Sequence, residues 1–410
     1  MNVLWICNVA IPSISISENL RIENAGCWMI RSTEEISKCV DITYAFPNRK
    51  IVCGTLGNIK YKSFPQSEIN EKGTKKALHD IITSDNFDVI HIHGTEFKHT
   101  YIALEICNSI GIIDRCVVSI QGMVSVCAKH FYTGLDPRII YGYYPRDLFR
   151  GNINSEKKAF ERRGNFEVRS LQMAENVIGR TIWDKTCVYD INPNLKYYVN
   201  NETLRDSFYQ EEKWTLSQCT RHTIFMSQAS YPIKGGHFAI EAIGILKRRY
   251  PDIQLRIAGK NMIDVPFYKK SYYQKYLSDL INKYNIRDNV SFMGQLDETQ
   301  MIAEYKNANA FISASTIENS PNSVCEAQIL GVPVISSMVG GVQSLITHEI
   351  SGLLYQSDAP YMLAHYIDSI FKNDDLSNRL SRSEIKIAEK RHNVNDITSR
   401  MLSIYSSIIG

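Results

Sequence analysis

The sequence has few features that would set it apart from an ordinary globular protein, and each absence narrows its class. No uninterrupted apolar run reaches the roughly 18 residues that a membrane-spanning helix needs, and no low-complexity tract interrupts the 410 residues. The formal net charge is only +3, from 46 Lys and Arg against 43 Asp and Glu. A balance this close to neutral gives no support to nucleic-acid binding by itself.

Patterns of disulfides and metal ligands are also absent. The ten cysteines stand singly, without a C-x-x-C pair, and Cys7, Cys107, Cys116 and Cys325 lie in apolar runs, as buried free thiols do. The opening residues, MNVLWICNVAIP, have no basic segment and no small-residue cleavage site, so we expect a first strand rather than a signal peptide. We therefore expect reduced thiols, no metal site and a cytoplasmic protein.

What the sequence does contain is a repeated alternation of strand-like and helix-like segments. With 410 residues, 44% of them hydrophobic, it has material for two or three domains. The alternation predicts α/β domains with doubly wound sheets. Because the stretch around 200–218 is polar and poor in β-branched residues, we expect a first domain over 1–205, a linker over 206–219 and a second domain over 220–389.

The most informative stretch runs from residue 308 to residue 337 and is patterned as strand, loop, helix and strand. Pro321 suits the first helical position, with Ser320 as its side-chain cap. Gly331 is expected to end the helix, and Val332–Ile335 to form a buried parallel strand. Such a unit points the helix N-terminus, with its free N–H groups and positive dipole, beyond the strand ends. The stretch therefore predicts an anion site that suits a phosphate.

Two carboxylates frame this expected phosphate site. Glu318 precedes the helix and Glu326 lies inside it, about 7–8 Å along the axis from Pro321 at a 1.5 Å rise per residue. Carboxylates repel a phosphate, but they accept hydrogen bonds from hydroxyl groups on either side of one. Either glutamate alone would be interpreted as a solvated helix acid. Together they match a diphosphate with a sugar at one end and a ribose at the other.

The whole arrangement is more specific than its parts. Glu318-Asn319-Ser320-Pro321-Asn322-Ser323 is followed by Glu326-Ala327, by the run from Gly331 to Ile335 and by Gly340-Gly341. This resembles the two-glutamate, E-x7-E signature of retaining family 4 glycosyltransferases of the bacterial polysaccharide type. The resemblance implies a GT-B fold: two Rossmann-like, doubly wound α/β domains facing a central cleft. The first domain would bind the acceptor, the second would bind a nucleotide-sugar donor, and the last helix, about 390–410, would return to the first domain.

A second motif of the family lies after the expected strand Thr223–Met226. The run from Ser227 to Gly236 resembles the loop in which an Arg and a Lys clamp the donor diphosphate, and Lys234 matches that Lys. The Arg position is occupied by Ala229, a departure from the family pattern. Arg180, at the end of another expected strand, could supply the second cation. The alternative is an arginine paired with Asp184 in packing between the domains.

The resemblance also implies a set of site residues. Catalytic roles fall to Glu318, Lys234 and Arg180. The donor-contacting residues are Gly26, Gln228, Lys234, Gly259, Gly294, Glu318, Asn319, Ser320, Pro321, Asn322, Ser323, Glu326, Gly340 and Gly341. Of these, Gly26 is the single glycine left of a family pair that follows the first strand, because Ala25 stands beside it.

Three residues of the first half are expected to contact the acceptor or the sugar: His93, Glu96 and Gln121. They follow expected strands, whose carboxyl ends bind ligands in α/β sheets. His91 and His93 share one face of their strand, and the alternative for either is a buried packing histidine. Many family members carry a histidine where Gln121 stands.

The stretch from Arg138 to Arg169 is basic, with eight Lys and Arg against four acids, and Tyr141 and Phe149 are among the aromatics that interleave with it. Such a stretch suits an anionic acceptor or a membrane surface, and the alternative is a solvated helix. We therefore expect a retaining hexosyl or N-acetylhexosaminyl transferase acting on a saccharide or lipid-linked acceptor in surface polysaccharide synthesis, at the inner face of the membrane. No metal, cofactor or nucleic acid is expected. A nucleotide-sugar 2-epimerase and a non-catalytic nucleotide-sugar binding protein remain as alternatives.

Overall fold

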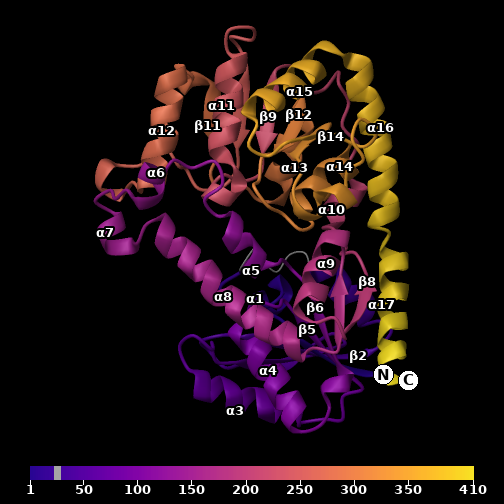
Figure 1. Cartoon of the computed structure of the whole chain (residues 1–410). Coiled ribbons are helices and arrows are strands. Elements are labelled where there is room, and N and C mark those ends of the chain that lie inside the picture. The colour runs from indigo at the N-terminus through magenta and orange to yellow at the C-terminus, as the bar shows by residue number, and fades with distance from the viewer. Residues whose placement is uncertain (23–28) are drawn as a thin grey trace. The chain divides into compact units, whose positions relative to one another are not determined.

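The computed structural model describes residues 1–22 and 29–410 and divides into two compact units (Figure 1). The first unit comprises Met1–Val126, Glu161–Arg205 and His392–Gly410. The second unit comprises Cys127–Phe160 and Asp206–Arg391. The chain therefore enters each unit more than once. Among the residues described, no helix is long and apolar enough to cross a membrane.

The first unit is built on an eight-stranded sheet in the order β3-β4-β2-β1-β5-β6-β7-β8. All neighbouring strands are parallel except β3 and β4, which are antiparallel. Its central strands are near-continuous apolar runs, as strands covered on both faces require. The strands are β1 (Asn2–Ile6), β2 (Asp41–Pro47), β3 (Cys53–Leu56), β4 (Ile59–Phe64), β5 (Val89–His93), β6 (Cys116–Ser119), β7 (Asn176–Gly179) and β8 (Lys196–Val199).

Helices cover both faces of this sheet because alternate residues of each strand point in opposite directions. Leu4 and Ile6 of β1 pack with α3, α4 and α9, whereas Val3 and Trp5 pack with α2 and α17. The helices with residues in this unit are α1 (Pro12–Ser17), α2 (Met29–Ile36), α3 (Glu71–Ile82), α4 (Lys98–Ser109), α5 (Val124–Cys127), α8 (Ile153–Met173), α9 (Ile182–Ile191) and α17 (Val394–Ile409). Helix α1 begins with Pro12 at its first position, where the missing N–H costs nothing.

The second unit is built on a six-stranded sheet, and every neighbouring pair in it is parallel. The order is β11-β10-β9-β12-β13-β14. The strands are β9 (Thr223–Met226), β10 (Gln254–Ile257), β11 (Val290–Phe292), β12 (Ala310–Ser313), β13 (Val334–Ser337) and β14 (Leu353–Tyr355). The helices of this unit are α6 (Pro137–Tyr141), α7 (Asp147–Arg150), α10 (Asp206–Gln210), α11 (Gly236–Leu246), α12 (Tyr272–Tyr284), α13 (Glu298–Asn307), α14 (Asn322–Leu330), α15 (Pro360–Lys372) and α16 (Asp374–Arg391). The prediction of two Rossmann-like, doubly wound α/β domains is confirmed.

Each sheet has one point where the chain reverses its direction of winding. In the first sheet this point lies between β1 and β5, and in the second it lies between β9 and β12. Loops that leave two such strands part to opposite faces and leave a crevice at the carboxyl ends, where α/β sheets bind their ligands. The two sheets thus mark, before any side chain is considered, where a functional site belongs.

Two stretches lie elsewhere than the sequence predicted. Residues 206–219 were expected to be a linker, but α10 and Trp214 belong to the second unit, where the buried indole Nε1 donates to the carbonyl of Ala308 at 2.8 Å. Residues 127–160 were expected in the first domain and group with the second unit instead. There the N–H of Tyr272 donates to Asp147 at 2.8 Å, and the Thr316 hydroxyl donates to the carbonyl of His130 at 3.2 Å.

Candidate functional site

The predicted strand–helix–strand unit is formed by β12, α14 and β13 in the second unit. Its helix begins one residue later than expected, because Pro321 has an extended ψ of 117° and serves as the N-cap. Ser320 is therefore not the capping residue, and Pro321 makes no side-chain capping bond. The helix ends at Gly331, whose φ of +82° lies in the left-handed region that glycine adopts most easily. The N-terminus of α14 thus lies in the loop that leaves β12, at the point where the winding reverses.

The loop that leaves β9 closes tightly on the end of β12. Gly235 has a φ of +68°, and a Cβ there would lie 1.8 Å from the carbonyl oxygen of Ala314. Only glycine allows this approach. The N–H of Thr316 also donates to the carbonyl of Ile233 at 2.7 Å, so the two loops are fixed to each other.

This closure brings Lys234 and Glu318 together. The ammonium of Lys234 donates to Glu318 Oε1, and the hydroxyl of Ser315 donates to the same oxygen at 2.8 Å. Burial lowers the pKa of Lys234, but the Glu318 carboxylate and the neighbouring Tyr231 outweigh it, and the pKa is raised overall. Lys234 is therefore a permanent cation at the crevice between β9 and β12.

The expected glycine turn after β13 rests on the same loop. The N–H of Gly341 donates to the carbonyl of Glu318 at 2.9 Å. A Cβ at Gly340, where φ is +48°, would lie 2.1 Å from that carbonyl oxygen. The Gly340-Gly341 turn therefore fixes the backbone that carries Glu318 and leaves no room for a side chain at its first residue.

Glu326, the second glutamate, has different surroundings. It lies on α14, it is 8% exposed, and it accepts a hydrogen bond from the hydroxyl of Tyr305 at 3.2 Å. The same hydroxyl donates to the carbonyl of Ser323 at 3.0 Å. Sequence reasoning missed Tyr305, which lies on α13, because no local pattern links that helix to α14. Glu318 thus pairs with a cation, and Glu326 accepts a hydrogen bond from a hydroxyl on a neighbouring helix.

Three further residues of the predicted donor set follow neighbouring strands of the second sheet. Gly259 and Gly294 follow β10 and β11, and the N–H of Gly259 donates to the carbonyl of Gly294 at 2.7 Å. Gln228 follows β9 and is partly buried. Ala229, which stands at the family's arginine position, is buried, and a Cβ at Gly236 would lie 2.8 Å from its Cβ. Gly26 lies outside the described residues.

The first unit carries the predicted acceptor residues at the carboxyl ends of β5 and β6. His93 packs on Trp5 with ring centroids 4.8 Å apart, and burial lowers its pKa to about 3, so the imidazole is neutral. His91 lies between the hydroxyls of Tyr405 and Ser119, each 2.7 Å from one of its ring nitrogens. His91 is therefore a packing residue that joins α17 to the sheet.

Glu96 follows β5 and is 8% exposed. Burial, with a smaller contribution from the nearby carboxylate of Glu167, raises its pKa to about 7. Glu167 is itself fixed by the N–H groups of Val124 and Ser125, each at 2.9 Å, and by the hydroxyl of Thr95 at 3.0 Å. Glu96 thus exchanges its proton near neutral pH.

Gln121 and Arg180 are joined by a residue that the sequence did not reveal. Glu202 accepts from Gln121 Nε2 at 3.1 Å and from Arg180 Nη1 at 2.6 Å. Arg180 Nη2 also donates to the carbonyl of Gln121 at 2.8 Å. The predicted pairing of the guanidinium with Asp184 is wrong, because Asp184 accepts the backbone N–H of Arg180 and forms the capping box of α9 with Thr181.

Comparison with known proteins relates the second unit to glycosyltransferases. Residues 210–386 match the family model described as Glycosyl transferases group 1. The matched region is less than half of the chain, and it contains every predicted site residue of the second unit. That region therefore agrees with the predicted resemblance at the level of group 1 glycosyltransferases.

Individual relatives agree with this class. The chain is 26% identical over 180 residues to the putative glycosyltransferase YtcC of Bacillus subtilis. This match covers 43% of each protein. It is 24% identical over 177 residues to the D-inositol 3-phosphate glycosyltransferase of Corynebacterium urealyticum. That match covers 43% of this chain and 41% of the relative. The matched region thus spans less than half the length of each of these two relatives.

Solved structures match over nearly the whole chain. Sucrose-phosphate synthase from Thermosynechococcus elongatus has a TM-score of 0.69 at 13% identity and covers 100% of this chain and 99% of that one. Anabaena Alr3699/HepE in complex with UDP-glucose has a TM-score of 0.67 at 16% identity, over 99% and 100% of the two chains. At these identities the likeness shows the fold, which is the predicted GT-B class.

Proposed function

We propose that the protein transfers a sugar from a nucleotide-diphosphate donor to an acceptor hydroxyl, with retention at the anomeric carbon. The observation that carries the proposal is the meeting of Lys234 and Glu318 at the crevice between β9 and β12. They come together within the region that matches the group 1 family.

The donor diphosphate would bind at Lys234 and at the N-terminus of α14. The ammonium and the helix dipole both stabilise the negative charge that grows as the sugar leaves. Backbone groups of Ser320 to Ser323 and of the Gly340-Gly341 turn add to this stabilisation. The proposal assigns the diphosphate charge to these groups and invokes no metal ion.

The two glutamates would orient the donor from opposite ends. Glu318 would accept hydrogen bonds from sugar hydroxyls, and Glu326 would accept them from the ribose, whose hydroxyls it would share with Tyr305. Neither acts as a nucleophile. The bond from the anomeric carbon to the phosphate oxygen breaks, the acceptor oxygen bonds to the same face of that carbon, and a departing phosphate oxygen takes the acceptor proton.

The acceptor would bind at the carboxyl ends of the strands of the first sheet. A pocket there is lined in part by Asn8, Asn48, Gln66 and Arg21. Amide side chains both donate and accept hydrogen bonds, which suits the hydroxyls of a saccharide. His93, Glu96 and Gln121 follow the next strands of the sheet. The proposed acceptor is a saccharide or lipid-linked saccharide of surface polysaccharide synthesis, and the proposed transferred sugar is a hexose or N-acetylhexosamine.

The test is incubation of the full chain with UDP-, GDP- and ADP-sugars, with and without a lipid-linked saccharide acceptor. Transfer to the acceptor, with an unchanged anomeric configuration by NMR, supports the proposal. Conversion of the donor to its 2-epimer without transfer would overturn it in favour of an epimerase. Tight donor binding without turnover in any combination would overturn it in favour of a binding protein.

A further inference from the structure

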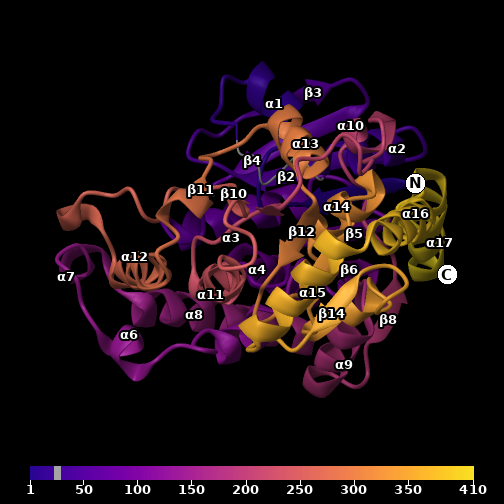
Figure 2. The ribbon, with the colours of Figure 1, turned by 90° about the horizontal axis from the view of Figure 1, so that it is seen from above.

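A group of large apolar side chains is exposed on α6, α7 and the short 3-10 helix η5 (Phe267–Lys269) of the second unit. Tyr144, which lies between α6 and α7, contacts Phe267 of η5, and the two ring centroids are 4.9 Å apart. In Figures 1 and 2, α6 and α7 lie beside α12, which follows η5. We name the group the aromatic patch, and its members and exposed fractions are Tyr141 67%, Tyr143 58%, Leu148 71%, Phe149 89%, Phe267 62% and Tyr268 65%.

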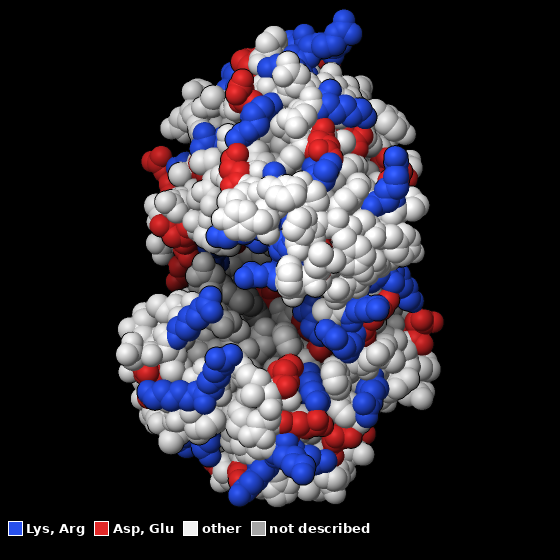
Figure 3. Space-filling model, turned by 90° about the vertical axis from the view of Figure 1, so that its left-hand side faces the viewer, with Lys and Arg blue, Asp and Glu red and all other residues white. Residues whose placement is uncertain are grey.

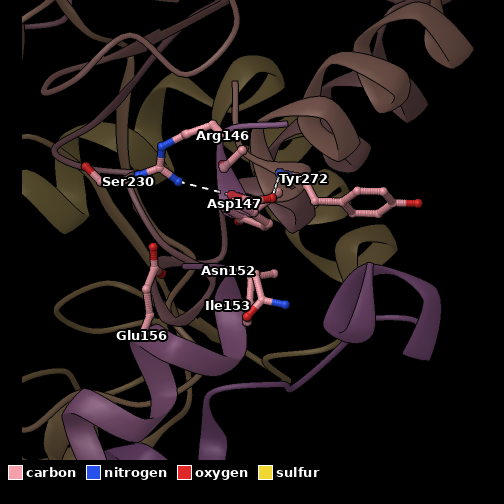
Figure 4. Close-up of a pocket in the computed structure, with 9 residues that line it drawn as sticks. Arg146, Asp147, Asn152, Ile153, Glu156, Ser230 and Tyr272 are labelled. Atoms are coloured by element: carbon pink, nitrogen blue, oxygen red, sulfur yellow. Dashed lines mark hydrogen bonds and ion pairs between the residues drawn. The ribbon is translucent and has the colours of Figure 1, made fainter. Parts of the chain in front are cut away.

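A buried carboxylate holds this patch in place. Asp147, at the start of α7, is 2% exposed and accepts the N–H of Tyr272 at 2.8 Å and that of Tyr144 at 3.1 Å. Arg146 Nη1 donates to its other oxygen at 3.2 Å, and Figure 4 shows Arg146, Asp147 and Tyr272 in one pocket. Because Asp147 fixes α7 to the start of α12, the next two residues, Leu148 and Phe149, are presented to solvent by a fixed backbone. Their exposure is therefore a property of the fold.

The charges around the patch are predominantly positive. Arg150 and Lys269 are exposed, and the Lys269 ammonium lies 5.6 Å from the centroid of the Tyr268 ring. The acidic neighbours are offset, because Asp136 pairs with Arg138 at 3.0 Å and Asp147 is buried against Arg146. Figure 3, which looks onto this side of the molecule, shows uncharged surface bordered by Lys and Arg.

We propose that the aromatic patch docks the protein on the surface of an anionic membrane. Tyrosine and phenylalanine side chains enter the boundary between headgroups and acyl chains, about 5–10 Å deep, while basic side chains stay at the anionic headgroups. A second copy fits less well. A two-fold interface would bring the patch against itself and so oppose Arg150 and Lys269 to like charges.

The proposal does not rest on glycosyl transfer, because docking needs neither donor nor acceptor. Of the basic stretch from Arg138 to Arg169 that the sequence predicted, the proposal retains only α6, α7 and the residues between them as the membrane-binding segment. It also adds η5, which contributes two aromatic residues and Lys269 from more than 100 positions further along the chain.

The test is cosedimentation of the full chain with two kinds of vesicle. One is made of phosphatidylcholine alone, and the other also contains about 30% phosphatidylglycerol, an anionic lipid. We expect binding to the anionic vesicles, which weakens severalfold as salt rises from about 0.05 to 0.5 M. Leu148→Ser combined with Phe149→Ser should lower the partition coefficient at least tenfold. The matched control is Ile350→Ser combined with Tyr361→Ser, two residues of the same unit that are 51% and 63% exposed and lie outside the patch. It should bind as the unaltered protein does.

Two further measurements make the result decisive. Circular dichroism should give the same melting temperature for the patch variant (Leu148→Ser with Phe149→Ser) and for its control. Arg150→Gln combined with Lys269→Gln should reduce the salt dependence of vesicle binding. Equal binding by the patch variant and the control, or equal binding to neutral and anionic vesicles, would overturn the proposal. A dimer seen by light scattering that the patch variant abolishes, without vesicle binding, would overturn it in favour of contact between copies.

Discussion

Lys234 and Glu318 form an ion pair across 84 residues of sequence, each in the loop that leaves a strand beside the winding reversal of the second sheet. Each side chain holds the other where a donor is proposed to bind. A diphosphate entering the crevice would attract the ammonium and release the carboxylate to the hydroxyls of the sugar. The pair therefore couples the two halves of the proposed donor.

This coupling leads to a prediction for Glu318. Glu318→Gln keeps the shape of the side chain but removes its charge, so sugar hydroxyls lose a charged acceptor. We expect turnover to fall at least tenfold, a loss of about 1.4 kcal/mol in transition-state stabilisation. Binding of UDP or GDP alone should be retained, because neither carries a sugar. Initial rates and calorimetric titration with the free nucleotide measure the two effects.

The control for Glu318→Gln is Glu349→Gln, which removes a carboxylate whose side chain is 69% exposed. It should leave both quantities unchanged. Loss of nucleotide binding in Glu318→Gln at an unchanged melting temperature would place Glu318 at the nucleotide instead of the sugar.

Glu326 should act on binding more than on turnover. If it accepts hydrogen bonds from the ribose, Glu326→Ala should weaken donor binding by about 1.5–3 kcal/mol, the range for hydrogen bonds to charged groups. Tyr305→Phe removes the neighbouring hydroxyl but keeps the carboxylate, so a smaller loss is expected. Calorimetry with the free nucleotide gives both values, and unchanged affinity in a folded Glu326→Ala protein rules the role out.

The central part of the site could be predicted because glycines that the backbone requires lie next to its motifs in the sequence. Gly331 ends α14 through a left-handed backbone that few other residues adopt, and Gly235 and Gly340 mark two close approaches of backbone to backbone. These constraints lie within a few residues of the motifs that carry them. Sequence alone therefore located Lys234 and Glu318 on the loops that the sheet brings together.

Long-range partners could not be predicted, because nothing local specifies them. Glu202 joins Gln121 to Arg180 from a polar stretch without a pattern, and Tyr305 reaches Glu326 from another helix. Residues 127–160 look like a continuation of the first domain, yet their anchor, Asp147, binds the N–H of Tyr272, 125 residues away. The start of α14 was misplaced by one residue because the fixed φ of proline suits both the N-cap and the first helical position.

Arg180 provides a third prediction. Its side chain is 6% exposed, and its hydrogen-bond partners, Glu202 and two backbone carbonyls, all lie in the first unit. These contacts favour a packing role over binding of the donor. Arg180→Lys cannot reproduce several N–H bonds from one planar group, so we expect a lower melting temperature and near-normal activity per folded molecule. A tenfold loss of turnover at an unchanged melting temperature would assign Arg180 to the donor diphosphate instead.

The last prediction concerns a buried carboxylate outside the site. Glu384 on α16 is fully buried, and its Oε1 accepts the N–H of Val334, the first residue of β13, at 3.0 Å. Burial raises its pKa to about 8, although that hydrogen bond lowers it. In the unfolded chain a glutamate has a pKa of about 4.3. Between these two values the folded protein holds a proton that the unfolded chain has released, so stability falls as pH rises through this window and levels off above it.

Glu384→Gln tests this dependence because its amide oxygen can still accept from Val334 but never ionises. The melting temperature of the variant should rise relative to that of the unaltered protein as pH rises from 5.5 to 8.5. The difference should be largest at the upper end of this range. Glu349→Gln controls for the removal of one exposed charge. A constant difference between Glu384→Gln and the unaltered protein across that range would show that Glu384 is ionised in the fold. The contact between α16 and β13 would then hold a buried negative charge on a single backbone N–H group, a far costlier arrangement than the neutral acid expected here.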